Sequence, residues 1–178
     1  MRTFLIALVT VIWASAAFAE ETEPAQAEPP MTFERLAAIV TALDPEAVAR
    51  GAALEFSLAD IPIIVIADPR ADRMRAMVPI ASAQGLTEAD LMRMMQANFD
   101  SALDARYAVA HGRLWGVFIH PLSPLEKDQF LSGLVQTITV ARTYGTAYTG
   151  GGAVFGGGDS NRIYRELLES LRKKGEAL

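Results

Sequence analysis

The sequence predicts an α+β domain in which helices pack on a five-stranded sheet, mixed or antiparallel. Three observations support this fold class. Segments with strand-like alternation come as a group of three and a group of two, and segments with helical spacing lie before, between and after them. The 178-residue chain is 51% apolar and has no cysteine, so one core without cross-links is the natural organisation. The expected order is helix, three strands, helix, two strands, helix.

The N-terminus has the features of a secretory signal peptide. A short basic start at Arg2 precedes an apolar run from Phe4 to Ala14, and Ala17-Phe18-Ala19 has the small-x-small form of a cleavage site. A membrane anchor is the alternative, but the 17 uncharged residues 3–19 fall short of the roughly 20 that span a bilayer. We expect residues 1–19 to be removed and the mature protein to be periplasmic, without a stable membrane anchor.

Residues 20–31 carry four glutamates and three prolines, and we expect a disordered acidic leader. An α+β domain then covers residues 32–144. Its first helix is predicted over 33–43 from the spacing of Phe33, Leu36, Ala37 and Val40, and Asp44-Pro45 ends it.

Three strands follow in a meander. Leu54 to Leu58 alternates, as a strand with one wet side does. Ile63 to Ala67 is apolar throughout, which is typical of a central strand covered on both faces, and Arg73 to Ile80 alternates again. Thr87 then caps a second helix that runs to about Phe99.

A hairpin is predicted from 105–110 and 113–119, because His111-Gly112 suits a two-residue reversal. Ser123 and Pro124 indicate the start of a third helix, about 124–142. Residues 145–158 are rich in glycine and indicate a flexible linker. An amphipathic helix over 159–178 closes the chain, with Tyr164, Leu167, Leu168 and Leu171 on its inward side.

The order of elements resembles the Tir-type chaperones of type III secretion and the YbjN-like proteins of similar fold, here as an exported variant. The residues that carry the resemblance are Leu91, Met95, Ala97, Asn98 and Phe99 of the second helix, Gly112-Arg113-Leu114 of the hairpin, and Pro121, Leu122 and Asp128 before and in the third helix. The resemblance covers about residues 32–142. It implies a homodimer without catalytic residues that holds an extended partner segment along apolar surface and exposed sheet edges.

The sequence argues against an enzyme and against bound cofactors or metals. The two histidines, His111 and His120, lie at opposite ends of one predicted strand and cannot share a ligand. The glycine tract follows a helix, lacks lysine and precedes Asp159, so it does not suit a phosphate. A net charge of -5 disfavours nucleic acid.

The methionines suggest a binding surface. Met92, Met94 and Met95 cannot share one direction on a helix, so we expect at least one to meet solvent, a second subunit or a partner. Core filling is the alternative interpretation. The predicted partner-binding or dimer residues are Met74, Met77, Leu91, Met92, Met94, Met95 and Phe99.

The preferred function is an exported, chaperone-like module that binds a polypeptide segment of a partner protein, aided by strand addition at a sheet edge. The alternative is a small-ligand binder with an apolar pocket between sheet and helices. The predicted pocket residues are Val65, Trp115 and Phe118.

Overall fold

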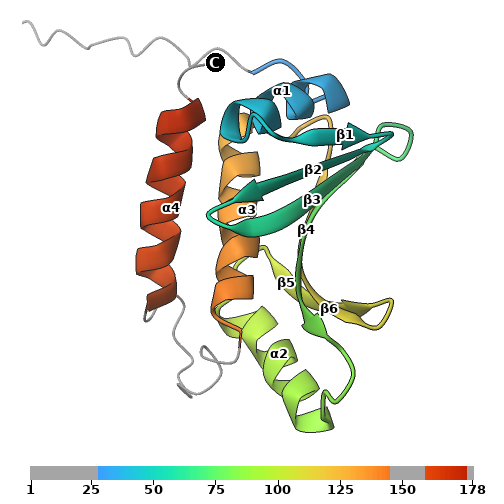
Figure 1. Ribbon diagram of the computed structural model, residues 1–178, viewed down its shortest axis with the longest axis vertical. Coiled ribbons are helices and arrows are strands. Elements are labelled where there is room, and N and C mark those ends of the chain that lie inside the picture. Colours follow the sequence, from blue (N-terminus) through green and yellow to red (C-terminus); the bar gives the residue numbers. More distant parts are fainter. Residues whose placement is uncertain (1–27, 145–158, 176–178) are drawn as a thin grey trace, which may run out of the picture.

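The computed structural model describes residues 28–144 and 159–175, and these form one sheet with helices packed on it (Figure 1). The strands pair throughout as antiparallel neighbours, in the order β1-β2-β3-β4-β6-β5. The elements are α1 (Phe33–Leu43), β1 (Val48–Arg50), β2 (Ala53–Leu58), β3 (Ile61–Asp68), β4 (Arg73–Ser82), α2 (Glu88–Asp100), β5 (Arg106–Ala110), β6 (Arg113–Pro121), α3 (Lys127–Arg142) and α4 (Asp159–Gly175).

The predicted five-stranded sheet is wrong, because the sheet has six strands. The additional strand is β1, three residues that pair with Ala53 to Glu55 of β2. All three β1 residues are exposed, so the strand has no buried alternation from which it could be predicted. The order therefore has four strands, not three, between α1 and α2.

The helices lie on one side of the sheet, and the core fills the space between (Figure 1). Alternate residues of β2, β3 and β4 point into this core and are buried, because successive side chains of a strand point to opposite faces of the sheet. The helix α3 covers the middle of the sheet with an almost continuous buried surface, which includes Phe130, Leu134 and Ile138. A smaller cluster joins Met94 of α2 to Leu114 of β6.

The predicted limits of α1 and the cap of α2 are confirmed. Thr87 accepts a hydrogen bond from the backbone N–H of Asp90, whose carboxylate accepts one from the N–H of Thr87, so both groups of the capping box are present. The helix α3 begins at Lys127, later than predicted, because Ser123 does not cap it. Ser123 instead donates from its N–H and its hydroxyl to Asp72, which ties the β3–β4 turn to the end of β6.

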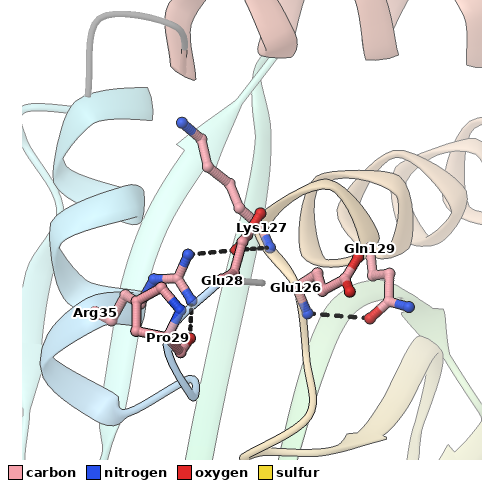
Figure 2. A network of polar contacts seen from close by, with 6 residues as sticks. All are labelled: Glu28, Pro29, Arg35, Glu126, Lys127 and Gln129. Atoms are coloured by element: carbon pink, nitrogen blue, oxygen red, sulfur yellow. Dashed lines mark hydrogen bonds and ion pairs between the residues drawn. The ribbon is translucent and has the colours of Figure 1, made fainter. Parts of the chain in front are cut away.

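A set of polar contacts joins the first described residue to the start of α3 (Figure 2). The Glu28 carboxylate pairs with Arg35 of α1 and accepts a hydrogen bond of 3.0 Å from the backbone N–H of Lys127. Figure 2 also shows Gln129 accepting from the N–H of Glu126 at 3.0 Å. The hydrogen bond from Lys127, more than the Arg35 cation, holds the pKa of Glu28 below its ordinary value.

The helix α4 packs on α3 and α1 (Figure 1). Leu171 is buried, and Leu167 and Leu168 pack against the core as predicted. Arg172 pairs with Asp128 of α3 at 3.1 Å. Within the described residues no helix has the length and apolar character needed to cross a membrane. The predicted signal peptide, most of the predicted leader and the predicted glycine linker lie outside the described residues.

Candidate partner-binding surface

Four large apolar side chains of α2 are exposed together. The exposed fraction is 43% for Leu91, 63% for Met92, 60% for Met95 and 74% for Phe99. Leu91, Met95 and Phe99 follow one another at intervals of four residues, and Met92 lies beside them, so they form a single ridge along the helix. We call these four residues the α2 stripe. Apolar groups gathered in this way mark a binding surface more often than single exposed ones do.

The rest of α2 holds the stripe in place. Met94 and Ala97 are buried against β5, β6 and α3 in the smaller core cluster. The Asn98 side chain pairs with the backbone of Tyr107, accepting from its N–H at 2.7 Å and donating to its carbonyl at 3.2 Å. The helix is thus fixed by packing on one side and by a pair of hydrogen bonds on another, which leaves the stripe facing outward on a rigid element.

The predicted binding residues do not all reach this surface. Met74 and Met94 are buried in the core, where the alternative interpretation of core filling applies. Met77 is half-buried on the face of the sheet that lies away from α3, separate from the stripe. Of the seven predicted binding residues, four therefore lie in the stripe: Leu91, Met92, Met95 and Phe99.

The residues of the alternative pocket are not brought together. Val65 and Phe118 are buried in the layer between the sheet and the helices, where the ring of Phe118 lies under Gly133 of α3. Trp115 is on the other face of the sheet, where its indole N–H donates to the Ala110 carbonyl at 3.1 Å. These three side chains do not line a common cavity.

A cavity of about 530 Å³ does lie beside Phe118, and most of the residues that line it are polar. It includes Asp104, Arg106, His120, Asp128, Gln136 and Arg172. Several of these groups already have partners: Gln136 donates to Asp104 and to Ser132, each at 3.2 Å, Arg172 pairs with Asp128, and Arg106 donates to the Ala105 carbonyl at 2.6 Å. No group of three or more side chains that could hold a metal ion occurs among the residues that the structure describes.

The sheet offers little free edge for strand addition. At β5, Asn98 occupies both backbone groups of Tyr107, and just before this strand the Gln136 side chain accepts from the N–H groups of Asp104 and Ala105 at 2.8 Å and 3.1 Å. The other edge strand, β1, is three residues long. Side-chain packing is therefore a better basis for partner binding here than backbone pairing.

A second apolar surface, which the sequence analysis missed, lies on the sheet itself. On the face away from the helices, neighbouring strands place large apolar residues side by side through the pairs Ile64–Met77–Val117 and Pro79–Trp115. Ile66 and Ile119 are exposed by 40% and 55%. We call this surface the open face and define it by seven residues: Ile64, Ile66, Met77, Pro79, Trp115, Val117 and Ile119.

The comparisons with known proteins give a structural similarity without a sequence match. No family model matches the chain, and no curated protein matches it. A solved structure, "Structure of the HopA1-SchA Chaperone-Effector Complex", contains a chain that is 7% identical to this one, with a TM-score of 0.49; the match covers 61% of this chain and 91% of that chain. A TM-score below 0.5 is too low to carry a functional argument, so the function has to be inferred from the surfaces described above.

Proposed function

We propose that this chain is a non-enzymatic, exported module that binds a polypeptide segment of a partner protein through the α2 stripe. The observation that carries the proposal is the stripe itself, four large apolar side chains exposed on a helix that is held in place by its buried residues Met94 and Ala97. Two of the four are methionines, whose unbranched thioether side chains adapt to apolar partners of different shape. Such a surface suits an apolar segment of a polypeptide better than a polar small molecule.

The absence of catalysis is part of the proposal. Among the described polar groups near the cavity of about 530 Å³, Gln136 is engaged with Asp104 and Ser132, and Arg172 with Asp128, which favours a structural role for them over a catalytic one. Export is also proposed, on the basis of the signal-peptide features of residues 1–19. Intact mass of the protein isolated from its host tests export: a chain beginning at Glu20 supports it, and one that keeps Met1 contradicts it.

Photo-crosslinking tests the binding surface directly. We would place a photoreactive phenylalanine analogue at position 99, in the stripe, and in a second protein at position 93, an exposed position about 120° around α2 from Phe99. Position 99 should give adducts that position 93 does not, and mass spectrometry of the adducts should identify an apolar polypeptide segment. Equal adducts at both positions, or none at position 99, would contradict the proposal.

A charge-matched pair of variants then measures the contribution of the stripe. Met92→Lys/Met95→Lys adds two positive charges within the stripe, and Ala89→Lys/Gln96→Lys adds the same charges at exposed positions outside it. The first pair should weaken binding of the identified segment by about a hundredfold, and the second by less than about threefold. Met94→Lys is unsuitable because Met94 is buried and the variant would unfold.

A further inference from the structure

The methionines of the described residues differ sharply in exposure. Three are buried, with exposed fractions of 2%, 1% and 3%: Met31, Met74 and Met94. Met77 is half-buried in the open face. Met92 and Met95 of the α2 stripe are exposed by 63% and 60%. Since the chain has no cysteine, methionine supplies all of its sulfur, and its two most exposed described methionines lie in the surface proposed to bind a partner.

Both exposed methionines lie within the stripe and not at its ends. Met95 lies one helical turn after Leu91 and one turn before Phe99, and Met92 lies one turn before Met95 on the adjoining side of the ridge. An apolar partner that contacts both Leu91 and Phe99 therefore passes over Met95. A polar atom added to either methionine would lie in the middle of that contact, where the partner displaces water.

Oxidation is the chemistry that an exposed thioether offers. The sulfur lone pair attacks one oxygen of hydrogen peroxide, so that an S–O bond forms while the O–O bond breaks. The proton of the attacked oxygen passes to the departing hydroxide, which leaves as water. The sulfur loses two electrons and the peroxide gains them, and the product is methionine sulfoxide, a polar and chiral side chain.

Oxidation of these two residues affects binding and leaves the fold intact. A sulfoxide oxygen that an apolar partner covers loses its water without gaining a hydrogen bond, which is unfavourable. The contacts that fix α2 are made by other residues, namely the buried Met94 and Ala97 and the hydrogen bonds between Asn98 and Tyr107. The stripe can therefore become polar while the helix that carries it stays in place.

We infer that Met92 and Met95 form an oxidation site that controls the α2 stripe, with a hydroperoxide as the oxidant. The stripe with two thioethers binds the partner segment, the stripe with two sulfoxides releases it, and reduction of the sulfoxides restores binding. The inference rests on the proposed function, because it states how binding at that same site is regulated. The selectivity of the oxidation is independent of any partner, since it follows from the exposed fractions of the methionines.

The first measurement is the order in which the methionines oxidise. The folded chain is treated with hydrogen peroxide, and fragmentation mass spectra of its peptides locate each added oxygen and separate Met94 from Met95. Met92 and Met95 should oxidise at least about tenfold faster than the buried Met74 and Met94. The unfolding temperature should stay unchanged while only Met92 and Met95 carry oxygen. Equal rates at exposed and buried methionines, or unfolding at that stage, would overturn the inference.

The second measurement is crosslinking from position 99 before and after oxidation, with the peroxide destroyed by catalase before the partner is added. Oxidation should lower the yield of adducts about tenfold or more, as the loss of about 1.4 kcal/mol of binding free energy would. Treatment with methionine sulfoxide reductases and dithiothreitol, which becomes a disulfide as the oxygen leaves as water, should restore the yield.

Met92→Leu/Met95→Leu is the decisive variant, because it keeps the stripe apolar and removes its sulfur. Its adducts should survive the same peroxide treatment, whereas Met77→Leu, altered on the open face, should stay as sensitive as the wild type. Equal yields from oxidised and untreated wild type, or a sensitive Met92→Leu/Met95→Leu protein, would overturn the inference and leave the proposed function standing. A lack of adducts from the untreated protein would overturn the proposed function, and the control of binding with it.

Discussion

At the residue scale, Gly133 allows α3 to approach the sheet. A Cβ atom at this position would lie 2.5 Å from a carbon of the Phe118 ring, closer than real side chains come. Alanine raises helix propensity by about 1 kcal/mol, but the clash costs about 3 kcal/mol. We therefore expect Gly133→Ala to lower the free energy of unfolding by about 2 kcal/mol in urea titration. Phe118→Leu in the same chain should restore part of the loss, since it removes the ring carbons nearest to the new methyl group. A Gly133→Ala protein as stable as the wild type would contradict the close contact.

Asp72 gives a pH dependence with a definite sign. The hydrogen bond from the Ser123 N–H is the main cause that lowers the pKa of Asp72 below its ordinary value of 3.8, and the Ser123 hydroxyl and Arg73 act in the same direction. A lowered pKa in the folded state stabilises the protein above pH 3.8, and this contribution is lost as the pH falls through the folded-state value. Asp72→Asn should therefore lower the unfolding temperature at neutral pH and lose less stability on acidification. Asp60→Asn, in an exposed turn, is the control of equal charge change. Parallel acid profiles for wild type and Asp72→Asn would contradict this role.

At the scale of elements, Asn98 joins α2 to the edge of the sheet. Its amide occupies the N–H and the carbonyl of Tyr107 as a neighbouring strand would. Asn98→Ala leaves both groups without this partner, so we expect the free energy of unfolding to fall by about 2 kcal/mol. Hydrogen exchange at the Tyr107 amide should become faster, while Gln96→Ala, on an exposed side of α2, should leave it unchanged. Unchanged exchange in the Asn98 variant would show that the edge is closed by something else.

The elements also show which features of the fold can be predicted from the sequence. The limits of α1 and the capping box of α2 were predictable because they depend on residues close in sequence. The strand β1 was not, since three exposed residues have no periodicity. On α2 the spacing indicated that its three methionines diverge, but the choice of Met94 for the core depends on Leu114 and Val140, distant in sequence. The open face was missed for a different reason. An apolar β3 predicts that another layer of structure packs on each face of the sheet, but the pattern does not show whether the same chain supplies both layers.

At the scale of the whole molecule, the helices lie on one side of the sheet and the open face lies on the other. Side-chain contacts occupy part of each lateral edge of the sheet: Asn98 and Gln136 bind backbone groups in and just before β5, and the Asp44 carboxylate accepts from the Ser57 N–H of β2, beyond the end of β1, at 2.8 Å. The outermost strand on that side, β1, has three residues. Little backbone is therefore left for an added strand, and exposed apolar side chains are the better basis for association.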